Sequence, residues 1–168
     1  SAQRFLTLEG FRGAGFEVVG MLNEPSAAGF EFTHRQPRSV NRKRTRVVVY
    51  DLGGGTFDAS LVRVDDLSHE VVSSIGINRL GGDDFDEALV GLALDAAGGA
   101  GDLPDRDLAT LRDQCRAAKE SLAPQTKRMA LDVATTPVLV AVDDFYRATA
   151  PLVVASLAAL EPLLGGLD

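Results

Sequence analysis

The chain has 168 residues, of which 45% are apolar and 24% charged, as is typical of a globular domain and not of a disordered segment. Its net charge of −7 argues against general attraction to nucleic acid or anionic membranes, and no apolar run reaches the roughly 18 residues that span a bilayer. A single cysteine, Cys115, excludes an internal disulfide framework, so we expect a cytoplasmic protein with neither nucleic-acid nor membrane partners.

The first part of the chain predicts two helices with a strand between them. Residues 2–15 favour a helix, and residues 16–22, which are apolar and partly β-branched, favour a strand. Residues 23–28 (NEPSAA) then turn the chain into a second helix, which Asn23 or Ser26 could cap. The segment from Arg35 to Arg46 contains six basic residues and no acidic one. We interpret this run as a solvated loop, with contact to a partner as the alternative.

The middle of the chain predicts an antiparallel meander around three consecutive glycines. Residues 46–50 (RVVVY) are a strand signal, and residues 57–64 and 70–75 follow as the second and third strands. The glycines at 53–55 predict a tight turn between the first two strands. Residues 80–86 (LGGDDFD) then lead into an amphipathic helix that glycines end near residue 98.

The last part of the chain predicts two helices around a pair of short strands. One helix begins at Pro104 and carries Cys115 on its apolar stripe, so we interpret this cysteine as a core residue. Strands are expected at residues 127–133 and 137–142. Asp143 and Asp144 are expected to cap the last helix, in which Pro151 predicts a kink or a break.

Residues 51–58 (DLGGGTFD) carry the clearest chemical signal. A strand delivers the Asp51 carboxylate, and the glycines let backbone amides approach an anion closely. Asp51 suits a hydrated Mg²⁺, which prefers one or two carboxylates plus waters, and Thr56 adds a hydroxyl. The lysine and serine or threonine of a Walker loop do not follow the glycines. Three glycines alone would equally suit an ordinary hairpin.

Three segments together resemble the DnaK-type, seventy-kilodalton heat-shock chaperone family. They are residues 23–28, 51–58 and 80–86, which occur in the family's order, and a weaker likeness extends from about Gln3 to Leu160. The resemblance implies an α/β fold of the ribonuclease-H-like, actin-like ATPase type, corresponding to the second lobe of the nucleotide-binding domain. The expected parts are a larger subdomain (1–98), a smaller α+β subdomain (99–142) and a C-terminal helix (143–168) that returns to the larger one.

The resemblance also implies a site for ATP or ADP with Mg²⁺. Glu24, Asp51 and Thr56 would lie nearest the reacting phosphate, with Asp51 holding Mg²⁺ through water. The expected nucleotide contacts are Gly53, Gly54, Gly55, Thr56, Gly81, Gly82, Arg116, Lys119, Glu120 and Ala123.

The helix that would line the adenosine pocket departs from the family pattern. The family usually reads Glu-Arg-Ala-Lys-Arg-x-Leu-Ser, whereas residues 116–123 read RAAKESLA. Lys119 is kept, but Arg116 and Glu120 reverse the family's charges and Ala123 replaces a serine. Arg116 and Glu120 could pair with each other at i,i+4 spacing. Adenine recognition is therefore less well supported than phosphate recognition.

The resemblance implies a fragment of an ATP-dependent chaperone whose ATP site is incomplete. The family's first phosphate hairpin and site lysine would lie upstream in the other lobe, and its Gly-Gly-Ser-Thr-Arg loop would follow Asp168. We therefore expect weak or no ATPase activity from this chain alone. Expected partners of the intact protein are the first lobe, an exchange factor, a co-chaperone and unfolded peptide. Alternatives are a regulatory interaction module that does not hydrolyse ATP, or an actin-like filament protein.

Overall fold

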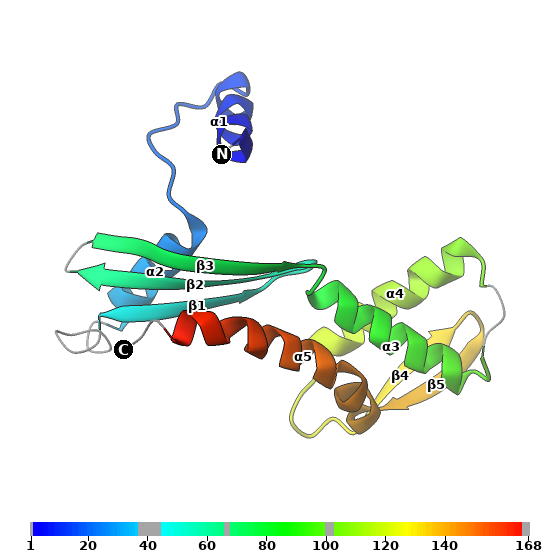
Figure 1. Ribbon diagram of the computed structural model, residues 1–168. Helices are drawn as coiled ribbons and strands as arrows, with labels where there is room; N and C mark the ends of the chain where they lie inside the picture. The colour runs from blue at the N-terminus through cyan, green and yellow to red at the C-terminus, as the bar shows by residue number, and fades with distance from the viewer. Residues whose placement is uncertain (1, 37–44, 66–67, 100–102, 166–168) are drawn as a thin grey trace. The chain divides into compact units, whose positions relative to one another are not determined.

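The computed structural model describes residues 2–36, 45–65, 68–99 and 103–165, which form a mixed α/β fold with small antiparallel sheets (Figure 1). The basic run predicted between residues 35 and 46 lies mostly outside these residues. The elements follow the order α1 (Ala2–Gly13), α2 (Glu24–Arg35), β1 (Arg46–Leu52), β2 (Thr56–Asp65), β3 (Ser68–Asn78), α3 (Gly82–Ala96), α4 (Asp105–Glu120), β4 (Arg128–Val133), β5 (Thr136–Ala141) and α5 (Val142–Leu164).

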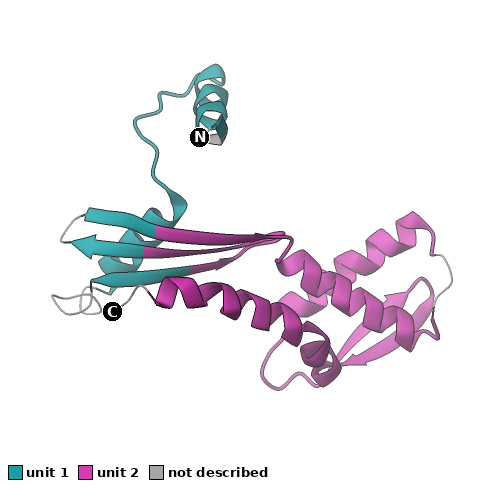
Figure 2. Ribbon diagram, in the orientation of Figure 1, with its two compact units in different colours: residues 1–49, 62–72 teal, residues 50–61, 73–168 magenta. Residues whose placement is uncertain are grey.

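Contacts divide the chain into two compact units (Figure 2). Unit 1 comprises residues 1–49 and 62–72, and unit 2 comprises residues 50–61 and 73–168. In unit 1, α2 packs closely on strand residues, because a Cβ placed on Gly29 would lie 3.3 Å from Val62 Cγ1. The Thr33 hydroxyl also lies 2.9 Å from His69 Nε2. A small residue at position 29 thus lets the helix approach the strands.

The strand predicted at residues 16–22 is absent, because residues 14–23 have no regular secondary structure in the part of the chain described. Phe16 and Val19 are 62% and 98% exposed, respectively. The prediction was wrong because apolar, β-branched composition favours a strand only where a partner strand can satisfy its backbone groups. Here the segment connects two helices without such a partner among the described residues.

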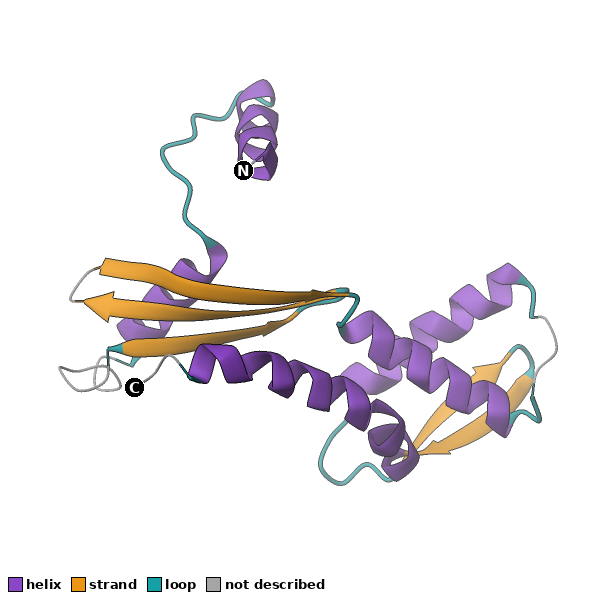
Figure 3. Ribbon diagram, viewed as in Figure 1, coloured by secondary structure: helices purple, strands orange, loops and turns teal. Residues whose placement is uncertain are grey.

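The predicted meander forms a three-stranded sheet with the order β1-β2-β3, in which consecutive strands run in opposite directions (Figure 3). In unit 2, Phe57 and Ala59 of β2 are buried against Leu163 of α5 and against Leu80, which precedes α3. This small core fixes the glycine end of the sheet, because Phe57 is the second residue after the three glycines and is fully buried.

A second and larger core of unit 2 lies among α3, α4, β4 and β5. It includes Leu89 of α3, Leu111 and Cys115 of α4, and Leu131 of β4, all buried. β4 pairs with β5 in antiparallel register from Arg128↔Ala141 to Val133↔Thr136. The expectation that Cys115 is a core residue is confirmed, since its side chain is fully buried.

α5 differs from its prediction in three respects. The helix continues through Pro151 without a break, and Asp143 and Asp144 lie in its first turn and not at the cap, which is Ala141. By length and composition alone it could cross a membrane, with a mean hydropathy of 1.3 over an 18-residue window. This property was not predicted from the sequence, and the same test is also met by core helices that are mostly buried, whereas 17% of this window is buried. Phe145 and Leu163 are buried in the two cores of unit 2.

Candidate functional site

The three glycines form the turn between β1 and β2, as predicted. The Gly53 amide donates to the Thr56 carbonyl across the turn at 2.9 Å. Asp51 lies near the end of β1 and Thr56 begins β2, and both are exposed. The turn therefore presents a carboxylate and a hydroxyl on either side of a short stretch of backbone that has no side chains.

The N-terminus of α3 is hydrogen-bonded to this turn. The Gly82 amide donates to the Gly53 carbonyl at 2.8 Å, and the Asp83 amide donates to the Gly54 carbonyl at 2.7 Å. A Cβ placed on Gly81 would lie only 2.4 Å from the Gly54 carbonyl oxygen, so this approach requires glycine at position 81. Residues 53–55 and 81–83 thus form one local unit, held by backbone contacts between segments about thirty residues apart.

These bonds determine which way the turn's own amides point. The described peptide bonds are all trans, so each carbonyl is directed opposite to the amide that follows it. Because the carbonyls of Gly53 and Gly54 point toward α3, the amides of Gly54 and Gly55 point away from it. Neither amide donates to a backbone acceptor outside the strand ladders in the part of the chain described. Two adjacent, exposed donors can bind an anion, and the positive end of the α3 dipole lies behind them.

The acidic first turn of α3 has two separate roles. The Asp84 carboxylate accepts a hydrogen bond from the Gly81 amide at 2.8 Å, and the Asp84 amide donates to the Gly81 carbonyl at 3.0 Å, which together fix the start of the helix. Asp83 and Asp86 instead face α4, and Asp86 is only 4% exposed. Asp86 was not among the site residues predicted from the sequence. Asp83 and Asp86 lie about one helical turn apart, and so do Arg116 and Lys119. This matched spacing of acids and bases was the signal in the sequence that could have identified Asp86.

Two cations of α4 pair with these carboxylates. Arg116 Nη2 lies 2.7 Å from Asp83 Oδ1 and its Nε lies 3.2 Å from Asp86 Oδ2. Lys119 Nζ lies 2.7 Å from Asp86 Oδ1 and donates to the Gly82 carbonyl at 2.8 Å. A hydrogen bond to Asp86 and the nearby Asp83 charge raise the pKa of Arg116 further above its ordinary value. Lys119 therefore connects α4 to Gly82, whose amide is hydrogen-bonded to the glycine turn.

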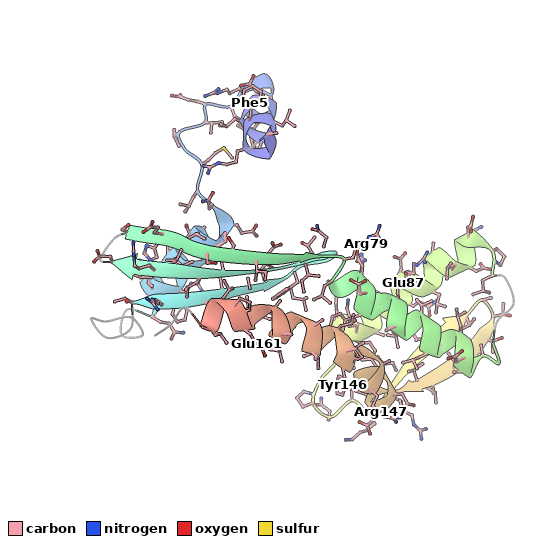
Figure 4. All side chains as sticks on the ribbon, viewed as in Figure 1. Phe5, Arg79, Glu87, Tyr146, Arg147 and Glu161 are labelled. Carbon is pink, nitrogen blue, oxygen red and sulfur yellow. The ribbon has the colours of Figure 1, made fainter. Side chains whose placement is uncertain are left out.

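The pairing suggested between Arg116 and Glu120 was therefore the wrong one. Arg116 reaches across to α3, and Glu120 is exposed without an ion pair in the described residues. A second cross-helix pair joins Arg112 to Glu87, whose side chain is labelled in Figure 4, with Arg112 Nε 2.5 Å from Glu87 Oε1. The row of opposite charges between α3 and α4 explains why Arg116 turns away from its own helix.

The remaining predicted site residues lie in different places. Ala123 follows α4, and its amide donates to the Thr126 hydroxyl at 3.1 Å. Glu24 begins α2 in unit 1, whereas the glycine turn belongs to unit 2. No group of three or more metal-ligating side chains occurs in the described ranges. Asp51 alone still fits a hydrated Mg²⁺, which needs only one or two protein carboxylates.

The chain is thus an α/β protein in which a glycine turn is hydrogen-bonded to the N-terminus of a helix. Similarity to known proteins identifies its family. A family model described as "Hsp70 protein" matches residues 1–144. The chain therefore belongs to the Hsp70 family, whose members are chaperones that bind ATP and Mg²⁺. The resemblance indicated by residues 23–28, 51–58 and 80–86 is thus confirmed.

Similar proteins include several described as "Chaperone protein HscA homolog". The one from Laribacter hongkongensis (strain HLHK9) is 42% identical over 125 residues, covering 74% of this chain and 19% of that protein. The one from Pseudomonas putida (strain KT2440) is 43% identical over 122 residues, covering 72% and 19%. The one from Burkholderia cenocepacia (strain HI2424) is 41% identical over 133 residues, covering 79% and 20%. The chain thus spans about a fifth of the length of these curated relatives.

Proposed function

We propose that this chain is part of the nucleotide-binding domain of an ATP-dependent chaperone, and that its glycine turn binds the phosphates of Mg²⁺-ATP. It would form an actin-like, ribonuclease-H-like lobe with the parts 1–98, 99–142 and 143–168. The observation that supports this most directly is the outward direction of the Gly54 and Gly55 amides, which follows from the bonds between the turn and α3.

Each predicted residue then has a chemical role in the proposal. The amides of Gly54 and Gly55 would donate to phosphate oxygens, with the Thr56 hydroxyl as a third donor. Asp51 would hold Mg²⁺ through its waters, and the ion would neutralise charge on the phosphates. Glu24 would act near the reacting phosphate. Gly53, Gly81 and Gly82 would keep the backbone close to the nucleotide.

The α4 residues would contribute to the other end of the nucleotide. Lys119 already binds Asp86 and the Gly82 carbonyl, so in this proposal it holds the turn and α3 in place as well as bordering the adenosine pocket. Arg116, Glu120 and Ala123 would line the same wall. The activity of the intact protein, with an exchange factor, a co-chaperone and unfolded peptide as partners in the cytoplasm, is proposed for a longer chain.

The test is a titration of the protein with Mg²⁺-ATP and Mg²⁺-ADP, followed by calorimetry and by amide chemical shifts. We expect the amides of Gly54, Gly55 and Thr56 to shift most. Thr56→Ala should weaken binding by about 10- to 150-fold, since a hydrogen bond to a charged group is worth about 1.5–3 kcal/mol. Thr56→Ser keeps the hydroxyl and should bind nearly as the wild type does. Saturation without shifts at these amides would contradict the proposal.

A second candidate is a regulatory interaction module that binds nucleotide poorly. The observation that favours it is the engagement of Arg116 by Asp83 and Asp86, where the family pattern has an acid. Under this alternative, a protein containing both lobes would show no Mg²⁺-ATP binding at millimolar concentration and no ATP hydrolysis. Binding with measurable hydrolysis in that protein would exclude it.

A further inference from the structure

One edge of β4 is partly covered by a side chain of α4. Gln114 Oε1 accepts a hydrogen bond from the Asp132 amide at 2.9 Å, and Gln114 Nε2 donates to the Asp132 carbonyl at 3.4 Å. The side-chain amide thus occupies both backbone groups of Asp132, as a neighbouring strand would. The two backbone groups of Asp132 must therefore point away from β5.

The register of the hairpin extends this conclusion along β4. Asp132 is opposite Pro137, which has no amide to donate, so this pair carries no full set of ladder bonds. The Val142 amide donates to the Lys127 carbonyl at 3.0 Å, which places odd-numbered residues of this segment on the side of β5. Because backbone direction alternates with period two, Arg128 and Ala130 direct their amides and carbonyls outward with Asp132.

The outward backbone of Arg128 and Ala130 lies beside an open groove of about 510 Å³. Small side chains form the opposite wall on α4, so a further strand at the usual spacing of about 4.7–4.9 Å meets no bulky side chain there. The wall residues are Ala117, Ala118 and Ser121 of α4, with Thr126 in the following loop. Gln114 closes the groove at its Asp132 end.

The charges at the other end of the groove indicate the chemistry of an occupant. Lys127 and Arg128 are exposed, and neither forms an ion pair with a residue that the structure describes. Two unpaired cations beside free backbone donors and acceptors favour an extended segment that carries carboxylates. From this combination we infer that the β4 edge docks an extended acidic peptide segment of a partner protein, by strand addition at Arg128 and Ala130.

This surface is separate from the proposed nucleotide site. It lies between β4 and the side of α4 that carries Ala117 and Ala118, whereas the glycine turn lies between β1 and β2. The pairing length is short, because only Arg128 and Ala130 offer free backbone groups before Gln114 covers Asp132. Binding should therefore be weak for an isolated peptide, and its specificity should come from the carboxylates.

The test is a titration of the full chain with a blocked hexapeptide of alternating valine and glutamate, followed by amide chemical shifts. We expect the largest shifts at the amides of Arg128 and Ala130. The same peptide with N-methylated backbone amides cannot pair as a strand and should bind at least tenfold more weakly. A peptide with glutamine in place of glutamate should bind about threefold more weakly, since each exposed charge pair contributes little.

Variants of the chain locate the binding edge. Ala130→Pro removes the outward amide and should abolish the shifts, and edge strands tolerate proline at such a position. Leu139→Pro is the matched control, because Leu139 is opposite Ala130 and directs its backbone to the other edge of the hairpin. Arg128→Glu leaves the backbone intact. It should weaken binding of the glutamate peptide but not of the glutamine peptide. Equal binding of the N-methylated peptide, or loss of binding with Leu139→Pro but not with Arg128→Glu, would overturn the inference.

Discussion

Gly81→Ala should strongly destabilise the contact between α3 and the glycine turn. The added Cβ would lie 2.4 Å from the Gly54 carbonyl oxygen, whereas ordinary contact begins near 3.4 Å, so the segments must separate by 1.0 Å (3.4 − 2.4). This shift breaks the two hydrogen bonds from Gly82 and Asp83, worth about 1 kcal/mol each. Overpacking adds about 1–3 kcal/mol. We expect a loss of about 3–5 kcal/mol in the free energy of unfolding.

The assay is urea denaturation followed by circular dichroism, with amide hydrogen exchange at Gly82 and Asp83 as a local readout. Gly91→Ala is the matched control, because Gly91 lies within α3, the helix that Gly81 immediately precedes, and a Cβ there meets nothing within 4 Å. It should stabilise the chain by about 0.5–1 kcal/mol through helix propensity. If Gly81→Ala unfolded within about 0.5 kcal/mol of the wild type and kept both amides protected, the reasoning about this contact would be refuted.

Two further predictions concern unit 2. Burial, helped by the charges of Asp86 and Glu87, raises the pKa of Cys115 from 9.0 to about 12. Iodoacetamide should therefore label the native thiol far more slowly than the urea-unfolded thiol at pH 8.5, and equal labelling rates would contradict the raised pKa. Because the pKa is higher in the folded state, the thiol's contribution to the free energy of unfolding should be complete below pH 9 and fall as the pH rises toward 12. Tyr50→Phe removes the 2.6 Å hydrogen bond to the Ser156 hydroxyl and should cost about 1 kcal/mol in urea denaturation, whereas an unchanged midpoint would mean that this bond contributes nothing.

Local signals were sufficient to predict the meander, the turn and most helices. The triple glycine marks a reversal that few other sequences allow, and the strands on either side are apolar enough to need burial. Residues 16–22 carry a similar apolar signal, but whether a strand forms there depends on a partner strand elsewhere in the chain. Pro151 lowers local helix propensity, yet the helix continues through it. Phe145 before the proline and Leu163 after it are both buried, and this burial stabilises the helix as a whole.

The arrangement of the candidate site could be predicted only in part, and the reason lies in Arg116. Local spacing suggested Glu120 as the partner of Arg116 on the same helix, but the packing of α3 against α4 brings Asp83 and Asp86 to Arg116 instead. That packing also determines what Lys119 does, because Asp86 and the Gly82 carbonyl hold its ammonium group.

The Gly82 amide is in turn bonded to the Gly53 carbonyl, so a change on α4 can reach the glycine turn through a single residue. Substitutions at Lys119 should therefore alter the turn even if this side chain never touches a nucleotide. For that reason the effect of Lys119→Ala on nucleotide affinity cannot by itself identify a ligand-binding residue. The amide shifts of Gly54 and Gly55 without nucleotide separate the two roles: a positioning role moves them, and a purely ligand-binding role leaves them unchanged.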